Sequence, residues 1–245
     1  MKDKELLRYS RQIMLPQVDI DGQQKLIDSS AMIIGMGGLG SPSAYYLAAA
    51  GVGHLIIADF DQVELSNLQR QIIHSTADIG KDKVDSAKET LTALNPEIKV
   101  TTIKELTAEN LMSLVSHADI VLDGTDNFKS RFAINKACVA AKTPLVSAAV
   151  IRFEGQLSVF KGYEVDQPCY QCLYSAEGGD TENCVENGVL APVAGILGTM
   201  QALQAVKVLL NLGEQLSAEL MLVDALDLSF RKVKISKDSQ CPICN

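Results

Sequence analysis

Short apolar runs and longer segments of mixed polarity alternate along the first 150 residues of the chain. Most runs have the length of strands buried on both faces, whereas the longer segments show helical spacing of apolar residues or a high alanine content. Strands are expected at residues 31–34, 54–58, 98–103, 120–123 and 144–149. Helices are expected at residues 41–50, 83–94, 108–116 and 128–141. This alternation predicts an α/β fold with a doubly wound, Rossmann-like, mostly parallel sheet.

The two ends of the chain have a different pattern. Residues 4–14 and 21–28 predict two short helices before the first strand, and residues 194–212 predict a long helix near the end. The apolar stripe of that long helix is expected to contain Ile196, Met200, Leu203 and Leu210. Short strands, expected to be antiparallel, lie at residues 155–160, 219–224 and 230–235. The polar segment at residues 175–188 is expected to form a loop.

A glycine-rich loop follows the first predicted strand. Glycines at Gly35, Gly37 and Gly40, with Gly38 between them, fit the pattern G-x-G-x-x-G, which brings backbone N–H groups and a helix N-terminus against phosphate. Asp59 comes nineteen residues after Gly40, at the end of the second strand, where a carboxylate can accept a hydrogen bond from a ribose hydroxyl. These residues predict a nucleotide site. On their own they favour NAD or FAD.

Cationic and amide side chains near the predicted loops change that preference. Asn67 and Arg70 follow closely behind Asp59, and Arg11 and Lys83 lie in similarly polar segments. Attack on an α-phosphate places negative charge on the pyrophosphate leaving group, and such cations can stabilise that charge. A solvated helix face is the ordinary explanation for any one of these cations, so the hypothesis depends on their joint presence. The chain also lacks a Tyr-x-x-x-Lys pair for hydride chemistry.

The loop after the fourth predicted strand carries acidic residues. Carboxyl ends of parallel strands meet at one edge of a sheet, so this loop and the glycine loop are expected to face one pocket. Asp126 is the expected ligand of Mg²⁺, with Asp123 as the alternative, because this hard cation prefers carboxylate oxygen.

Four of the six cysteines form two Cys-x-x-Cys pairs: Cys169, Cys172, Cys241 and Cys244. Their spacing suits a structural, tetrahedral Zn²⁺ site that the fold must assemble from distant segments; four unrelated buried thiols are the alternative. Cys138 lies in a predicted helix interior and is expected to be a core residue. Cys184 lies in the polar segment, either as a reactive thiol or as an exposed unreactive one.

Composition excludes several classes of protein. Lys and Arg number 22 against 30 Asp and Glu, which gives a net charge of −8 and argues against coating nucleic acid. Hydrophobic residues make up 47% of the chain, which is ample for a core. No apolar stretch is expected to reach the roughly 20 uninterrupted residues of a membrane span, and the N-terminus does not resemble a signal peptide. We therefore expect one domain of a cytoplasmic protein that does not enter a membrane.

Six segments together resemble the ThiF/MoeB adenylyltransferases, the bacterial relatives of ubiquitin-activating enzymes. They are residues 8–12 (RYSRQ), 35–40 (GMGGLG), 59–61 (DFD), 66–71 (SNLQRQ), 80–83 (GKDK) and 123–127 (DGTDN). The resemblance extends over nearly the whole chain. It implies a nucleotide-binding core at about residues 20–150 and a carrier-binding and zinc region at about residues 151–245.

The resemblance also implies the reaction. The C-terminal Gly-Gly carboxylate of a small ubiquitin-like sulfur-carrier protein attacks the α-phosphate of Mg-ATP and yields an acyl-adenylate and pyrophosphate. No general base is needed, because the carboxylate is ionised at neutral pH. The molybdopterin pathway is expected, with the thiamine pathway as the alternative. An NAD-dependent oxidoreductase and a non-catalytic nucleotide-binding module are the competing classes.

Residue roles follow from the same resemblance. Asp59 would hold the ribose, and Asn67, Arg70 and Lys83 would contact the phosphates and stabilise the transition state. Asp126 would bind Mg²⁺, and the resemblance supports the four-cysteine zinc site. Arg11 matches an arginine that such enzymes insert from the partner subunit of a homodimer. Cys184 matches a cysteine that joins the activated carrier in thiamine-type members and is dispensable in molybdopterin-type members.

Overall fold

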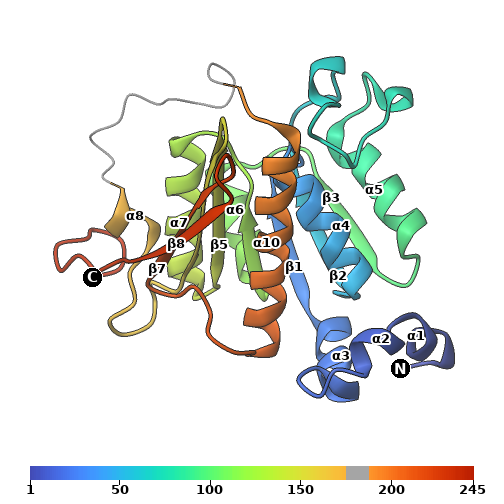
Figure 1. The fold of residues 1–245 in the computed structure, drawn as a ribbon, viewed down its shortest axis with the longest axis horizontal. Coiled ribbons are helices and arrows are strands. Elements are labelled where there is room, and N and C mark those ends of the chain that lie inside the picture. Colours follow the sequence, from blue (N-terminus) through green and yellow to red (C-terminus); the bar gives the residue numbers. More distant parts are fainter. Residues whose placement is uncertain (175–187) are drawn as a thin grey trace.

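A single mixed sheet organises the computed structural model, which describes residues 1–174 and 188–245 (Figure 1). Its eight strands have the order β3-β2-β1-β4-β5-β6-β7-β8. Their bounds are β1 Ser30–Ile34, β2 His54–Ala58, β3 Lys99–Ile103, β4 Ile120–Asp123, β5 Leu145–Ile151, β6 Glu154–Phe160, β7 Glu219–Asp224 and β8 Ser229–Lys234. Strands β1 to β5 pair in parallel, and β5 to β8 pair antiparallel. The predicted α/β class with an antiparallel extension is confirmed.

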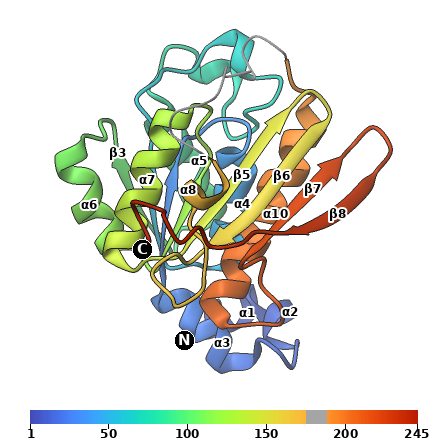
Figure 2. The same ribbon diagram turned by 90° about the vertical axis from the view of Figure 1, so that its left-hand side faces the viewer.

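Helices cover both faces of the sheet (Figures 1 and 2). Their bounds are α1 Asp3–Arg8, α2 Ser10–Ile13, α3 Asp19–Asp28, α4 Gly40–Ala50, α5 Lys83–Leu94, α6 Ala108–Ser116, α7 Phe128–Ala141, α8 Tyr170–Leu173 and α10 Ala191–Leu210, with 3₁₀ turns η1 Leu65–Asn67 and η2 Thr76–Asp78. Successive residues of a strand point to opposite faces, so Ile33 packs under α4 and α10 while Met32 packs under α6 and α7. Each face therefore has its own apolar core.

The register of the central strands positions the site. Ile34, at the end of β1, pairs with Ala58 at the end of β2 and with Asp123 at the end of β4. The chain leaves one half of the sheet after β3 and enters the other half at β4, next to β1. Ligands of open α/β sheets bind at such a reversal of strand order, outside the carboxyl ends of the strands.

Helix α10 differs from the sequence prediction in its bounds and in its buried face. It begins at Ala191, and Pro192 fits in its first turn because the N–H that proline lacks would have no partner within the helix there. It ends where Asn211 adopts a left-handed conformation, φ 56°. The predicted apolar stripe was wrong at Leu203, which is 57% exposed. The buried face instead combines small residues, such as Ala194 and Gly198, with Leu197 and Leu209. A Cβ on Gly198 would lie only 2.4 Å from the Leu39 carbonyl oxygen, so α10 approaches α4 too closely for a side chain at this position.

In the part of the chain that the structure describes, α10 alone is long and apolar enough to cross a membrane by length and composition. Polar residues interrupt this helix at Gln201, Gln204 and Lys207, so it is not the uninterrupted apolar run that a membrane span was expected to need. Half of that stretch is buried inside the protein, where it packs against β5, β6 and α4.

Candidate active site

The loops at the carboxyl ends of β1, β2 and β4 line a cavity of about 1490 Å³, which extends along β6 to β8. Most of the residues predicted to bind nucleotide contribute to its wall: Gly35, Gly37, Gly38, Asp59, Arg70, Lys83 and Asp126. Distant segments of the sequence thus meet in one pocket, as the position of their loops predicted.

The glycine loop needs its first and last glycines for backbone geometry. Gly35 has φ +92°, and a Cβ there would lie 2.9 Å from the Gly124 carbonyl oxygen. A Cβ on Gly40 would lie 1.8 Å from the Gly35 carbonyl oxygen, which no side chain can tolerate. At Gly37, in contrast, a Cβ would meet only Gln71 Nε2, at 3.7 Å. Gly35 and Gly40 therefore form the turn, and Gly37 lines the space beside it.

Asp59 is held by backbone donors on both of its oxygens. Oδ2 accepts from the Met36 N–H at 2.7 Å, and Oδ1 accepts from the Asp61 N–H at 2.9 Å. Burial raises the pKa of this carboxyl, and the nearby charge of Lys83 opposes that shift. The carboxylate is fixed at the cavity wall with lone pairs left for a hydroxyl group, as a ribose partner requires.

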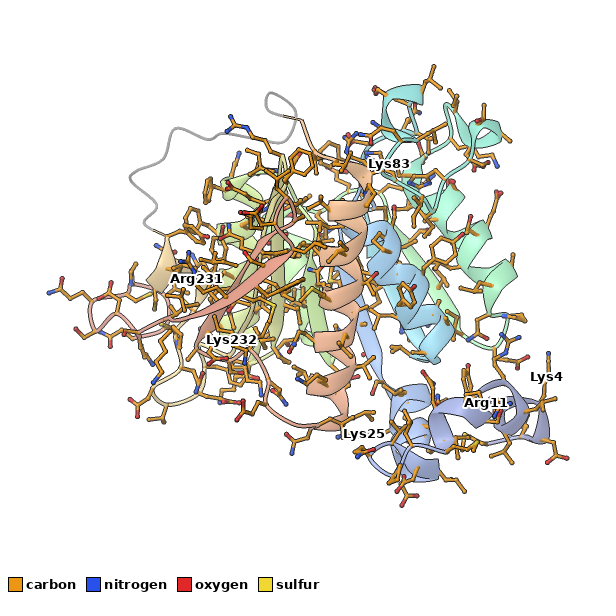
Figure 3. All side chains as sticks on the ribbon, in the orientation of Figure 1. Lys4, Arg11, Lys25, Lys83, Arg231 and Lys232 are labelled. Atoms are coloured by element: carbon orange, nitrogen blue, oxygen red, sulfur yellow. The ribbon has the colours of Figure 1, made fainter. Side chains whose placement is uncertain are left out.

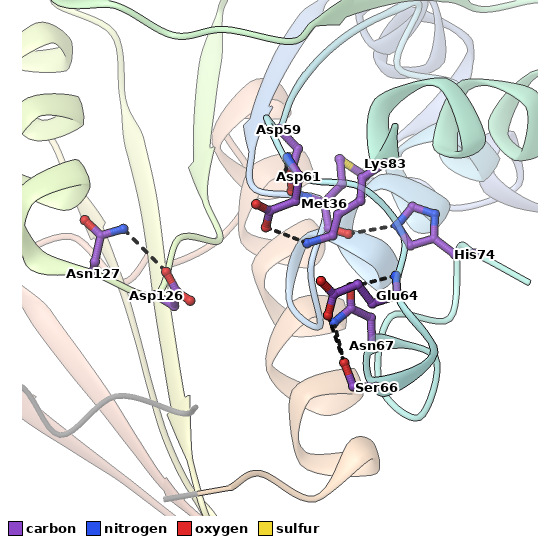
Figure 4. Close-up of polar contacts among 10 residues, drawn as sticks. All are labelled: Met36, Asp59, Asp61, Glu64, Ser66, Asn67, His74, Lys83, Asp126 and Asn127. Carbon is purple, nitrogen blue, oxygen red and sulfur yellow. Dashed lines mark hydrogen bonds and ion pairs between the residues drawn. The ribbon is translucent and has the colours of Figure 1, made fainter. Parts of the chain in front are cut away.

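Two of the predicted phosphate-binding cations reach the cavity. Lys83 begins α5 and is almost fully buried, with its Nζ 2.8 Å from Asp61 Oδ2 (Figure 4). Arg70 is half-buried, and its Nη1 donates to the Ser66 carbonyl oxygen at 3.2 Å. Both side chains thus bring positive charge to the wall beside the glycine loop.

Asn67 and Arg11 do not line this cavity within the described residues. The Asn67 side chain stays local: Oδ1 accepts from the Glu64 N–H at 3.3 Å, and Nδ2 donates to Ser66 Oγ at 3.4 Å. Arg11 lies on α2, among the N-terminal helices and away from Lys83 (Figure 3). Its Nη1 is 3.9 Å from Met14 Sδ. Phosphate contacts by these two residues stay predictions.

The two acidic candidates for Mg²⁺ differ in availability. Asp123 is fully buried and accepts from the Thr125 N–H at 2.9 Å, the Thr125 hydroxyl at 2.7 Å and the Ser147 hydroxyl at 3.3 Å. Asp126 is exposed at the cavity wall, where its Oδ1 accepts from Asn127 Nδ2 at 3.4 Å (Figure 4). Asp126 therefore offers the freer oxygens to a cation and fits the predicted role better.

Sequence reasoning missed Arg131 and gave no role to Gln71, although both line the cavity. Arg131 Nη2 donates to the Thr125 carbonyl oxygen at 2.6 Å and supports the loop that carries Asp126. Burial lowers the pKa of Arg131, but Asp123 raises it and the net shift is upward. Gln71 is buried, and its Oε1 has no hydrogen-bond partner among the described residues. No local pattern distinguishes a buried arginine or glutamine from one on a solvated helix face.

The fold brings the two Cys-x-x-Cys pairs together, as predicted. The four sulfur atoms of Cys169, Cys172, Cys241 and Cys244 lie within 4.8 Å of one another. The distance is 3.6 Å between Cys169 Sγ and Cys241 Sγ and 3.4 Å between Cys172 Sγ and Cys244 Sγ. A tetrahedral zinc–thiolate shell requires about 3.8 Å between sulfur atoms, so the cluster fits the ion. Asn135 Nδ2 donates to Cys169 Sγ at 3.4 Å, the kind of outer contact that orients a metal ligand.

The structure describes one of the two remaining cysteines, Cys138, and not the other, Cys184. Cys138 is buried in α7, which confirms it as a core residue, and burial raises the pKa of its thiol well above the ordinary range. Cys184 belongs to residues 175–187, outside the residues that the structure describes. Its chemical use stays a prediction.

Comparison with known proteins identifies the family. The model of the family described as "ThiF family" matches residues 9–243. The chain belongs to the ThiF family. Two relatives from Escherichia coli (strain K12) match it over its whole length: a molybdopterin-synthase adenylyltransferase, 46% identical, and a sulfur carrier protein ThiS adenylyltransferase, 47% identical. The chain covers 98% of the first relative and 97% of the second.

Solved structures agree with this ThiF assignment. E. coli MccB with MccA-N7isoASN superposes with a TM-score of 0.85 at 25% identity, over 97% of this chain and 75% of that one. E. coli MccB with ATP gives a TM-score of 0.82 at 25% identity, over 97% of this chain and 74% of that one. The predicted resemblance to ThiF/MoeB proteins is confirmed. The two E. coli relatives differ in their named pathway but hardly in identity, so overall similarity does not choose between pathways.

Proposed function

We propose that this ThiF-family chain adenylates the C-terminal Gly-Gly carboxylate of a small ubiquitin-like sulfur-carrier protein at the expense of ATP. One observation carries the proposal: Asp59 and Lys83 lie on one side of a single cavity, and Asp126 faces them from another loop (Figure 4). A ribose and a triphosphate need this combination of an acceptor, a cation and a metal ligand. Relatives named molybdopterin-synthase and ThiS adenylyltransferases support it.

The chemistry requires positioning and charge rather than proton transfer. A carboxylate oxygen of the carrier bonds to the α-phosphorus, and the bond from that phosphorus to the bridging oxygen breaks and releases pyrophosphate. Lys83 and Arg70 stabilise the charge that develops on the leaving group. Asp126 would hold Mg²⁺, which neutralises phosphate charge when bound. The attacking carboxylate is already ionised, so none of these residues needs to act as a base.

The size of the cavity supports a macromolecular second substrate. Its volume exceeds the roughly 300–1000 Å³ typical of a small-molecule pocket. Beyond the nucleotide loops it is lined by Gln156 on β6, Leu222 on β7 and Val189. We assign this extension to the extended tail of the carrier, which would enter beside residues 188–192.

Further parts of the proposal concern assembly and cofactors. The protein would act as a cytoplasmic homodimer, with Arg11 of one subunit completing the site of the other. This arrangement gives a role to Arg11, which is not among the described residues that line the cavity of its own chain and lies away from Lys83 (Figure 3). The four cysteines would hold a structural Zn²⁺ with no open position. The molybdopterin-synthase carrier is the proposed substrate, with the thiamine-pathway carrier as the alternative.

Pyrophosphate exchange into ATP tests the reaction directly. Exchange is expected only with a carrier that ends in Gly-Gly, and Asp126→Ala and Arg70→Ala are each expected to reduce it by about 100-fold or more. Lys25→Ala, an exposed cation on α3, is the control and should retain exchange. Comparing the two carriers side by side assigns the pathway. Absence of exchange with both would overturn the proposal, and ATP binding without exchange would favour a non-catalytic module.

A further inference from the structure

We propose that His74 is a positioning residue of the nucleotide site. It orients the Met36–Gly37 peptide of the glycine loop toward phosphate and joins that loop to the helix turn that carries Lys83. This inference deepens the proposed function and rests on its nucleotide site.

His74 is buried between two parts of that site. The ring, only 7% exposed, lies between the glycine loop and the first turn of α5. Its Nε2 is 3.2 Å from the Met36 carbonyl oxygen (Figure 4), and its Nδ1 is 2.9 Å from Ser86 Oγ. Both ring nitrogens therefore have partners, and each partner belongs to a different element.

The partners fix the tautomer of the ring. A carbonyl oxygen can only accept, so the hydrogen must be on Nε2, which donates to Met36. Burial lowers the pKa of His74, and the nearby charge of Lys83 lowers it as well, although the Met36 carbonyl, Asp59 and Asp78 act in the opposite direction. The neutral ring then has Nδ1 as an acceptor for the Ser86 hydroxyl.

The contact between His74 and the Met36 carbonyl also fixes the direction of the Gly37 N–H. The Met36 carbonyl and the Gly37 N–H belong to one planar trans peptide, so they point in opposite directions. Because the carbonyl is held toward His74, the Gly37 N–H is directed away from the ring. Gly37 lines the cavity, and the Met36 N–H on the preceding peptide donates to Asp59. The loop is thus held from both sides of Met36, with one N–H left for a phosphate oxygen.

Ser86 extends the same link to Lys83. The two residues lie three positions apart in the first turns of α5, so they share one side of the helix. Ser86 is almost fully buried, and its hydroxyl contact with His74 ties this turn to the glycine loop. One imidazole ring therefore sets the distance between two groups that would contact the triphosphate.

Two substitutions at His74 separate positioning from simple packing. The amide of Gln reaches close to the position of Nε2 and keeps a donor for Met36, whereas the shorter Asn can replace only the Nδ1 contact with Ser86. His54→Gln is the matched control. His54 is a half-buried imidazole on β2 that contacts Thr101 Oγ1 at 2.8 Å, and it does not line the cavity in the described part of the chain. The dissociation constants of ATP and adenosine and the thermal midpoint are measured for each variant.

His74→Asn is expected to weaken ATP by about tenfold and adenosine by less than about threefold, because the lost hydrogen bond orients a phosphate-directed donor. His74→Gln should stay within about threefold of wild type for both ligands. Equal losses for ATP and adenosine, or equal losses in the two variants, would show a purely structural role and overturn the inference. Wild-type protein that binds no ATP would overturn the proposed function as well.

Ser86→Ala gives a second comparison that does not depend on the folding of His74→Asn. It keeps the ring and its Met36 contact but removes the link to α5. We expect ATP to weaken by about threefold to fivefold while adenosine is unchanged. Unchanged ATP affinity in a folded Ser86→Ala variant would refute the link to Lys83.

Discussion

The Lys83 ammonium lies 2.8 Å from Asp61 Oδ2, although the Lys83 side chain is 6% exposed and that of Asp61 is 51% exposed. A cation directed at phosphate is thus already paired with a carboxylate of its own chain. Asp61 keeps the buried charge partnered, and a triphosphate must share Lys83 with it or replace it.

Replacing this carboxylate tests the competition. Asp61→Asn is expected to lower the free energy of unfolding by only about 1 kcal/mol, because Asp61 is half exposed and water screens the pair. Saturating ATP should raise the thermal midpoint more in this variant than in wild type, since phosphate would replace the missing carboxylate. Glu89→Gln, which breaks the exposed 3.0 Å pair with Lys81, is the control. Equal ATP-induced shifts in Asp61→Asn and wild type would contradict the competition.

Two glycines of the same loop are expected to respond differently to alanine. Gly40→Ala should reduce folded yield and lower the thermal midpoint, because its Cβ would lie 1.8 Å from the Gly35 carbonyl oxygen. Gly37→Ala should fold normally, since its Cβ would meet only Gln71 Nε2 at 3.7 Å, but should bind ATP more weakly because the methyl group enters the cavity. Thermal melts and ATP titration measure the two effects. An unstable Gly37→Ala variant would show that this residue also has a backbone role.

Mixing two inactive variants tests whether Arg11 acts across a dimer interface. Arg11→Ala and Asp126→Ala homodimers are each expected to be inactive. Subunit exchange between them should restore about a quarter of wild-type pyrophosphate exchange, because half of the dimers are mixed and each mixed dimer has one intact site. If Arg11 acted within its own chain, no mixed dimer would have an intact site and no activity would return.

The cysteine cluster predicts a metal content. Wild-type protein is expected to retain about one zinc ion per chain through purification, and Cys172→Ser should lose it and unfold at a lower temperature. Cys138→Ala is the matched control, because Cys138 is a buried thiol on α7 that is not one of the four clustered cysteines. The Cys138→Ala variant should keep its zinc, even if the loss of the buried sulfur atom lowers its thermal midpoint. Elemental analysis and thermal melts measure both quantities, and a full complement of zinc in Cys172→Ser would exclude the site.

Local sequence features predicted most of the helices and strands. The bounds of α5, α6 and α7 match the predicted ones, because apolar spacing and capping residues act within a few positions along the chain. The prediction was weakest for α10. Its large apolar side chains suggested one buried face, but close packing of Gly198 against α4 decides which face is inside.

The candidate site was predictable wherever a residue belongs to a motif next to a strand end, as Asp59 and Asp126 do. Arg131 and His74 were not assigned roles, because their importance comes from partners distant in sequence: Arg131 supports the Asp126 loop from α7, and His74 joins the glycine loop to α5. These contacts are important because the two side chains are buried, and no local sequence pattern shows that a given arginine or histidine is buried.

By itself, the sequence determined the alternation of strands and helices, the glycine spacing of the loop after the first strand and the two Cys-x-x-Cys pairs, because each is a pattern of near neighbours along the chain. Only the tertiary structure decided that the Cys169 and Cys241 pairs meet and that Lys83 is buried against Asp61. Strand order and helix packing bring these groups together across long separations in the chain, and the same packing excludes the water that would otherwise screen them.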